Sequence, residues 1–377
     1  MATRLFPGLI LLLASAVTAG ADESRRVSPT DLSKGADRVA QAMADGRLSL
    51  HAYKKDLAWE GLLRWGRASG RDDLVLQAQQ AAAGSGLTPG SDANFRRGPF
   101  NCLVFWLWQV SDDPRWLPGF VEQTRQYAAE VSRSPEGAIE HARGKKRGGG
   151  HAMLIDALQD YSSRMAMLGS VTDQPPHYRE AVRQYRIYRE VLRDPDTGLW
   201  SQGRGWLDDR SRLSPGAWSR GHGWLIRGMV DTLLLLPPES DEAAEMRGYL
   251  QELADALLEV QQPDGMWHCL LHRPAADSPP ETSGTALIAG NLAIAVASGF
   301  LDRERYADAA KRAFAALPAY IGEDGVIRSV SPGPGPLSEV EPWAVERFPP
   351  GDEHGPFAIF FAALGEERLR QMDRRSD

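Results

Sequence analysis

The chain has only two cysteines among its 377 residues, Cys102 and Cys269. Two thiols cannot supply a multi-disulfide framework, and they cannot hold zinc without help from histidine. The sequence contains no metal-binding pattern such as H-E-x-x-H, so we expect no metal and no other cofactor. Two alternatives stay open for the cysteines: one disulfide, or two buried free thiols.

Positive charge is also scarce, since 43 Lys and Arg residues face 50 Asp and Glu residues and the net charge is −7. An acidic chain lacks the basic surface that nucleic-acid binding needs, so we expect no nucleic-acid partner. The one dense basic run is 143–147, which includes Lys146. It fits either a solvated loop or a patch that attracts an acidic substrate.

Long apolar runs are missing after the first residues. Arg4, the apolar stretch 9–17 and the small residues 19–21 together resemble an export signal with a cleavage site. We therefore expect a signal peptide at 1–21, one mature domain at 22–377 and a secreted or periplasmic protein. The apolar stretch is too short to span a membrane comfortably, so no membrane contact is expected once the signal is removed.

A short turn signal recurs along the chain. Glu-Gly, Asp-Thr-Gly or Asp-Gly followed by apolar residues, which is typical of a β-hairpin turn, occurs around Gly137, Gly198, Gly265 and Gly325. These glycines are roughly 60 residues apart, which indicates a repeated supersecondary unit.

Between these turns the apolar residues recur at helical spacing. One helix is predicted before each turn at 178–192, 246–260 and 306–317, and another precedes each of these at 153–168, 225–236 and 285–300. About six such helix pairs fit in the chain. The sequence therefore predicts an all-α fold, an (α/α)6 barrel with short β-hairpins at one rim, with an open solenoid as the alternative.

The segment 218–224 holds, within seven residues, several side chains that could bind a ligand. Trp218, Arg220, His222 and Trp224 alternate with small residues and precede an apolar helical pattern. Indole faces stack on sugar rings, and a guanidinium binds a carboxylate in two parallel hydrogen bonds. The segment thus favours an acidic sugar as ligand, against the alternative that the tryptophans only fill the core. Lys146 is a second candidate for the sugar carboxylate.

An ordered set of motifs resembles a known family. The motifs are 154–158 (LIDAL), 198–203 (GLWSQG), 218–224 (WSRGHGW), 281–286 (ETSGTA) and 352–357 (DEHGPF). They resemble the unsaturated rhamnogalacturonyl hydrolases of glycoside hydrolase family 105 and, more distantly, the unsaturated glucuronyl hydrolases of family 88. The resemblance implies a barrel that removes an unsaturated uronic acid from the non-reducing end of lyase-generated oligosaccharides.

The resemblance also implies residue roles. Asp156 matches the catalytic acid that protonates C4 of the C4=C5 vinyl ether before water adds at C5. Substrate contact is implied for Arg220 and its flanking Trp218 and Trp224. Gly221 and Gly223 would let the backbone approach the sugar.

Two positions depart from the family pattern. Gln202 stands where histidine is usual, and His222 stands where asparagine or glutamine is common. Both are predicted to contact substrate, and His222 is a candidate to replace the missing histidine. A second acid expected early in the chain has no clear match around 96–102, and Asp92 is the nearest candidate.

Three other readings compete with this one. An inverting glycosidase would need a separate acid and base, for which Asp231, Glu281 and Asp352 are candidates. A sugar-binding pseudoenzyme would keep the pocket without turnover. A sugar epimerase would need two facing histidines, and only His222 is a candidate.

Overall fold

The computed structural model describes residues 30–90, 102–141, 152–333, 335–343 and 348–376. Within these ranges the chain forms twelve α-helices in six pairs. The first helices of the pairs are α2 (Asp31–Ala44), α4 (Asp72–Gly84), α6 (Leu117–Glu130), α9 (Pro175–Leu192), α11 (Asp241–Glu259) and α13 (Arg303–Ala316). The second helices are α3 (Ala52–Ser69), α5 (Leu103–Ser111), α8 (Asp156–Thr172), α10 (Ser219–Leu233), α12 (Thr282–Ala297) and α14 (Gly355–Ser376).

The two sets of helices differ in burial. Every residue of α10 is buried, and so is every residue from Thr282 to Val296 of α12, so these helices lie inside the molecule. In contrast, α9 buries one face, with Tyr178, Tyr185 and Leu192 among its buried residues. A helix that is apolar on one side only belongs on the outside of a core. The second helices therefore form an inner ring, and the first helices cover it.

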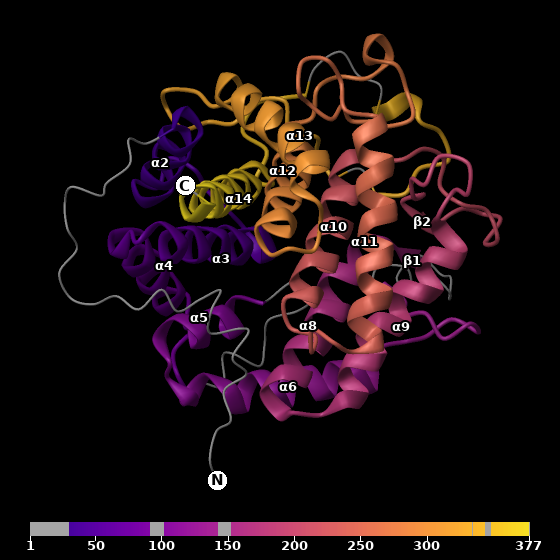
Figure 1. Ribbon diagram of the computed structural model, residues 1–377, viewed down its shortest axis with the longest axis horizontal. Helices are drawn as coiled ribbons and strands as arrows, with labels where there is room; N and C mark the ends of the chain where they lie inside the picture. The colour runs from indigo at the N-terminus through magenta and orange to yellow at the C-terminus, as the bar shows by residue number, and fades with distance from the viewer. Residues whose placement is uncertain (1–29, 91–101, 142–151, 334, 344–347, 377) are drawn as a thin grey trace.

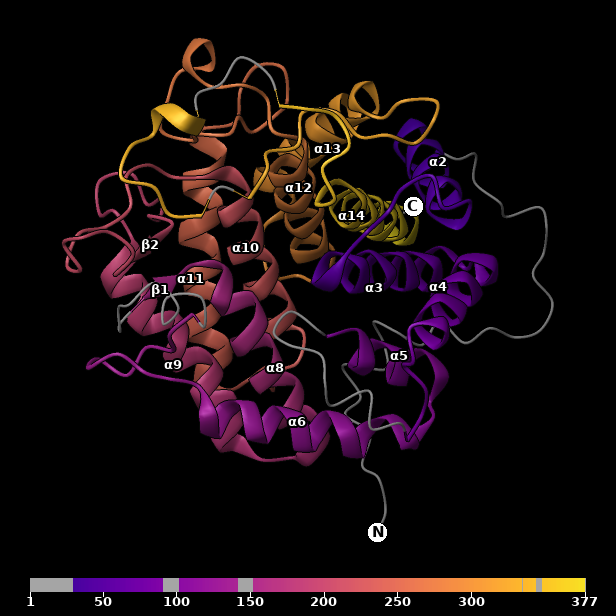
Figure 2. The same cartoon turned by 180° about the vertical axis from the view of Figure 1, so that it is seen from behind.

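The inner ring is closed. Neighbouring contacts run from α3 to α5, on through α6 to α8, then to α10, α12 and α14, and α14 packs back against α3. Figures 1 and 2 show this ring from its two sides, with the indigo α3 beside the yellow α14. The predicted (α/α)6 barrel is confirmed, because an open solenoid would leave its first and last units apart.

The predicted hairpins are confirmed at all four glycines. Isolated antiparallel bridges join Arg133 to Ile139, Arg193 to Trp200 and Ile321 to Ile327, and Gln262 donates its backbone N–H to the Met266 carbonyl. Gly137, Gly198, Gly265 and Gly325 have φ between +73° and +85°, where a side chain would be strained. Each hairpin follows an outer helix and precedes an inner one, so all four lie on the same rim.

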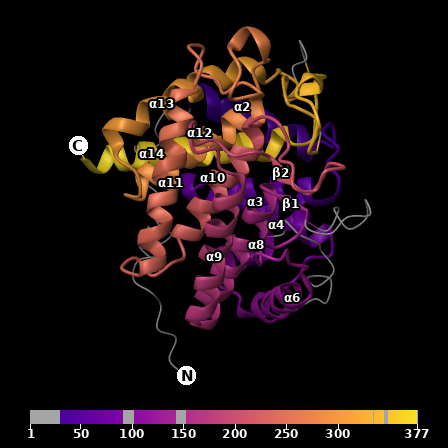
Figure 3. The same cartoon turned by 90° about the vertical axis from the view of Figure 1, so that its right-hand side faces the viewer.

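The same connectivity points the inner helices in one direction. All of them begin at the rim that carries the hairpins and run away from it. There β1 (Met153–Leu154), just before α8, pairs antiparallel with β2 (Gly203–Arg204), before α10. Figure 3 shows both strands on the side opposite the end of α14. We call this rim the mouth; it gathers helix N-termini, which attract anions.

Four charged side chains meet inside the ring. Arg64 binds Asp231 at 2.8 Å and Glu60 at 3.2 Å, and Arg227 binds Glu60 at 2.6 Å. All four are buried. Two positive and two negative charges compensate each other, which a buried charge requires. Because α3 and α10 are opposite members of the inner ring, this quartet ties the barrel together across its interior.

The structure also bears on the cysteines and on the expected absence of a membrane span. Cys102 and Cys269 are free, buried thiols, so the disulfide alternative is excluded. Burial raises the pKa of the Cys102 thiol, which keeps it protonated. The predicted signal peptide at 1–21 lies outside the described residues. Among the helices that are described, none combines the length and the apolar character that a membrane span requires.

The crossing of α12 and α14 gives a test of this packing. A methyl group on Gly290 would overlap the Phe361 carbonyl of α14, whereas nothing lies within 4 Å of one on Gly248 in α11. Gly290→Ala should lower the free energy of unfolding by about 1–3 kcal/mol through overpacking. Gly248→Ala is the matched control and should raise it by about 0.5–1 kcal/mol. Equal stability of the two variants in denaturant titrations would contradict this packing.

Candidate active site

Asp156 is the first residue of α8, as the sequence predicts, and lies at the mouth. Its neighbours Ile155, Ala157 and Leu158 are buried, whereas Asp156 itself remains partly exposed. Ile155 donates its backbone N–H to the Gln202 carbonyl at 2.9 Å, which extends the β1–β2 pairing to the start of the helix. The carboxyl group is thus held at a fixed place on the mouth by backbone structure on both sides.

Gly221 brings Asp156 beside the segment 218–224. A Cβ on Gly221 would stand 4.0 Å from Oδ1 of Asp156 and 3.2 Å from Cγ2 of Ile155. The backbone of this segment therefore lies beside Asp156, and the prediction that Asp156 and Arg220 serve one site stays a prediction. Gly223 instead makes room for Leu287 of α12, so protein side chains, rather than a sugar, occupy the space beside both glycines.

The segment 218–224 differs from the expected helix entrance, because α10 already begins at Ser219. Its two indoles are buried. Trp224 stacks on Phe357 at a centroid distance of 4.9 Å, and Trp218 packs near Trp343 at 6.4 Å. Both rings therefore contact the protein core in the structure, and their stacking on a sugar stays a prediction.

Arg220 is fully buried and lies 4.4 Å from the centroid of the Trp218 ring. Its Nη1 donates to Oγ of Ser283 at 3.1 Å and to Oγ of Ser331 at 3.0 Å. Nε and Nη2 are buried and have no hydrogen-bond acceptor. Nη2 points to the region of Gly333, where a Cβ would stand 3.5 Å from it. Unsatisfied buried donors are costly, so this edge of the guanidinium is suited to an anionic ligand.

Glu281 holds Arg220 from the other side, 3.9 Å from Nη1. It is the N-cap of α12 and accepts from Oγ of Ser283 at 2.6 Å and from the Ser331 N–H at 3.0 Å. These hydrogen bonds hold the carboxylate in one orientation. Glu281 therefore has a positioning role and is poorly placed to act as a general acid.

His222 is buried and bonded to backbone through both ring nitrogens. Nδ1 lies 2.8 Å from the Trp218 carbonyl, and Nε2 accepts the Trp200 N–H at 2.9 Å. Since a carbonyl only accepts, the proton sits on Nδ1 and the ring is neutral. Burial lowers the pKa of His222 to about 4. The imidazole thus ties the hairpin 193–200 to α10, and this geometry offers no ring nitrogen for the proposed replacement of the missing histidine.

Gln202 is buried directly next to β2, and its carbonyl Oε1 accepts no hydrogen bond. Its backbone carbonyl accepts the Ile155 N–H, one residue before Asp156. Its contact with substrate stays a prediction. Lys146 and Asp92 lie outside the described residues, as do 96–101, so the second acid cannot be located there.

The motif at 352–357 supplied one candidate, Asp352, as an acid or base of an inverting glycosidase, and sequence reasoning assigned His354 no role. In the structure, Oδ1 of Asp352 lies 2.6 Å from Nδ1 of His354, and Nε2 of His354 lies 2.9 Å from the Tyr53 hydroxyl. A Cβ on Gly333 would stand 3.6 Å from the His354 ring as well as close to Arg220. These three residues thus adjoin Arg220 at the mouth. The only signal in the sequence was the position of His354 just before an apolar helix.

The carboxylates proposed for an inverting glycosidase are all engaged. Asp231 belongs to the buried quartet, Glu281 caps α12, and Asp352 binds His354. None of them faces Asp156 as a second acid or base. The epimerase reading needs paired histidines, and both nitrogens of His222 are bound to backbone. Among the described side chains, no group of three or more His, Cys, Asp or Glu residues is placed to hold a metal ion.

Comparison with known proteins gives a consistent result. Residues 34–343 match the model of Glycosyl Hydrolase Family 88. The unsaturated rhamnogalacturonyl hydrolase YesR of Bacillus subtilis is 27% identical over 241 residues, covering 63% of this chain and 67% of YesR.

Solved structures share the fold. A family 105 glycoside hydrolase from C. acetobutylicum has a TM-score of 0.74 at 17% identity, covering 88% of this chain and 99% of its own. The unsaturated glucuronyl hydrolase of Bacillus sp. GL1 has a TM-score of 0.60 at 18% identity, covering 89% of this chain and 94% of its own.

The barrel and its mouth thus define a carbohydrate-active enzyme of the glycoside hydrolase class. The chain belongs to Glycosyl Hydrolase Family 88. The predicted class, a hydrolase of the unsaturated uronyl type that acts on lyase-derived oligosaccharides, is confirmed.

The burial of His222 predicts a pH-dependent stability. Its folded pKa of about 4 lies below the ordinary 6.5, so the unfolded chain binds the additional proton between these values. Stability should therefore fall as pH drops from 6.5 to 4, by about 3 kcal/mol from this residue. Denaturant titrations across this range should show a shallower loss for His222→Asn than for the wild type.

Proposed function

We propose that this chain uses Asp156 to protonate C4 of the C4=C5 bond of an unsaturated uronic acid at the end of an oligosaccharide. The bond is a vinyl ether, because C5 carries the ring oxygen. Protonation at C4 places positive charge on C5 and the ring oxygen, and water then adds at C5. The hemiketal opens and releases the remaining sugar, so one water is consumed for each uronate removed.

The observation that carries the proposal is the contact between Asp156 and the backbone of the segment that bears Arg220: a Cβ on Gly221 would stand 4.0 Å from Oδ1 of Asp156. Asp156 is partly exposed, although its Oδ1 is buried, and Arg220, the residue before Gly221, has two buried donors without acceptors. A substrate with a carboxylate beside its reacting double bond matches this pair. Because Arg220 is fully covered in the structure, the carboxylate reaches it only if the segment around Gly333 shifts.

The helix ends support the same assignment. All six inner helices, α3, α5, α8, α10, α12 and α14, start at the mouth within the described residues. Their N-terminal N–H groups favour negative charge, which assists binding of a uronate. A neutral sugar would gain nothing from this field. The proposed substrate is therefore an acidic sugar, and its leaving group is an oligosaccharide left by a polysaccharide lyase.

Asp156→Asn tests the catalytic role. The amide keeps the shape and cannot supply the proton, so turnover should fall by about 10²–10⁴-fold. The assay is the loss of ultraviolet absorbance of the C4=C5 bond in lyase-generated oligosaccharides. Asp173→Asn, at the exposed far end of α8, is the matched control and should be fully active. Undiminished turnover in Asp156→Asn would remove this residue from the mechanism.

The same assay decides the alternative of a sugar-binding pseudoenzyme. The buried Gln202 in place of histidine favours that alternative, because glutamine cannot carry charge. Such a protein would bind the unsaturated oligosaccharide and leave its absorbance unchanged. An ordinary glycosidase would release reducing ends from saturated substrates instead.

Arg220→Lys tests recognition of the carboxylate. Lysine keeps the charge beside Glu281 and loses the planar fork, so binding of the acidic sugar should weaken about 10-fold or more. Binding of its neutral methyl ester should change little. Calorimetric titration of both ligands gives the comparison. Equal losses for the two would show that Arg220 only supports the fold.

A further inference from the structure

Asp352, His354 and Tyr53 form a hydrogen-bonded chain that the proposed chemistry does not use. Asp352 and His354 precede α14, and Tyr53 lies in the first turn of α3. The distances are 2.6 Å from Oδ1 of Asp352 to Nδ1 of His354 and 2.9 Å from Nε2 of His354 to the phenol oxygen. Asp352 also accepts the His354 backbone N–H at 2.9 Å, which fixes the carboxylate.

The protons in this chain can be assigned. A carboxylate only accepts, so Nδ1 of His354 carries the proton that faces Asp352. Nε2 of a neutral imidazole is then an acceptor, and the Tyr53 hydroxyl must donate to it. The phenol oxygen can therefore only accept from any further group. Asp352, acting through His354, sets the direction of the Tyr53 hydroxyl.

The charges around His354 keep it neutral. Burial, followed by the nearby Arg220 guanidinium, lowers the pKa of His354 to about 4, and Lys54 acts in the same direction. Asp352 opposes this shift. The remaining neighbours are Glu353, which binds His51 and Lys54, and the uncharged Phe357 ring 6.1 Å away. At pH above about 5 the direction of the Tyr53 hydroxyl is thus fixed.

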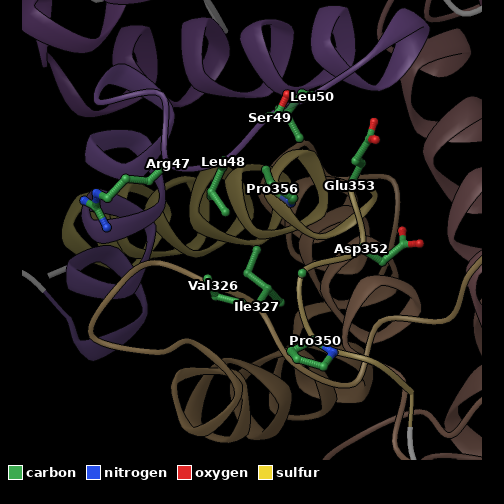
Figure 4. Close-up of a pocket in the computed structure, with 11 residues that line it drawn as sticks. Arg47, Leu48, Ser49, Leu50, Val326, Ile327, Pro350, Asp352, Glu353 and Pro356 are labelled. Carbon is green, nitrogen blue, oxygen red and sulfur yellow. The ribbon is translucent and has the colours of Figure 1, made fainter.

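A cavity of about 250 Å³ borders Asp352, but the chain of Asp352, His354 and Tyr53 does not form its binding groups. Its lining is mainly apolar: Leu48, Leu50, Val326, Ile327, Pro350 and Pro356. Figure 4 shows the Asp352 and Glu353 side chains pointing away from these residues. Asp352 instead binds His354, and Glu353 binds His51 and Lys54.

We propose that Asp352 and His354 are positioning residues that present the oxygen of Tyr53 as an acceptor for a free hydroxyl of the unsaturated sugar. Both Arg220 and His354 adjoin Gly333, so a sugar with its carboxylate on Arg220 has its ring beside Tyr53. An acceptor recognises a hydroxyl and rejects a sulfate ester at the same position, because ester oxygens need a donor. The inference rests on the proposed function and adds a specificity to that site.

A double-mutant cycle in Asp156→Asn tests this proposal, since that variant holds the substrate without consuming it. The ligand is an unsaturated uronyl disaccharide, and calorimetry gives its affinity. Tyr53→Phe and His354→Ala should each weaken binding by about 2- to 10-fold. Because His354 acts through Tyr53, adding His354→Ala to Tyr53→Phe should cause no further loss.

Additive losses in the cycle would overturn the proposal, as would tighter binding of a sulfated disaccharide than of the free one. Thermal unfolding checks each variant. If His354→Ala does not fold, Asp352→Asn takes its place and should likewise have no effect in Tyr53→Phe. Tyr249→Phe, whose hydroxyl binds Glu245 on the outer helix α11, is the matched control and should bind normally.

The activity of the wild-type enzyme distinguishes a failure of the proposed function from a failure of the role given to Asp352 and His354. If it leaves the ultraviolet absorbance unchanged and Asp156→Asn binds no disaccharide, the proposed function fails and takes this inference with it. If the wild type is active and the cycle is additive, only the role of His354 and Asp352 fails.

Discussion

The geometry of the mouth depends on the buried quartet of Glu60, Arg64, Arg227 and Asp231. Glu60 follows Tyr53 by seven residues on α3, and Arg227 follows Arg220 by seven on α10. Seven residues are two helical turns, or about 10 Å along the axis. The direct contact of Glu60 with Arg227 at 2.6 Å therefore brings Tyr53 and Arg220 to the same level two turns higher. A slide of α3 along α10 would separate these buried charges and leave them uncompensated, which is strongly destabilising.

Much of the fold could be predicted from the sequence because its signals are local and repeated. Asp-Gly turns and helical spacing give the unit, and several similar units can bury their apolar faces only by packing on each other. The site was partly predictable for the same reason: Asp156 and Arg220 both stand at predicted helix starts. That they are neighbours follows from the barrel, since successive inner helices begin side by side at one rim.

What the sequence could not provide was the partner of each polar side chain. Histidine is a residue type that often acts in catalysis, yet the two ring nitrogens of His222 bind the carbonyl of Trp218 and the N–H of Trp200. The chain Asp352–His354–Tyr53 joins residues 301 positions apart, and no periodicity connects them. The indoles of Trp218 and Trp224 are a similar case, because residue type alone does not distinguish a sugar platform from a core ring.

The closure of the ring by α14 has a consequence for how the protein is made. α14 is the last described helix, and it fills the place between α12 and α3, one of the first. Until it emerges from the ribosome, the apolar sides of α3 and α12 face water and the ring has a gap. Such an exposed, nearly complete intermediate is prone to aggregate. The helix that seals the barrel is thus made after both helices that it joins, and the seal includes the close approach of Gly290 and Gly365 at the crossing of α12 and α14.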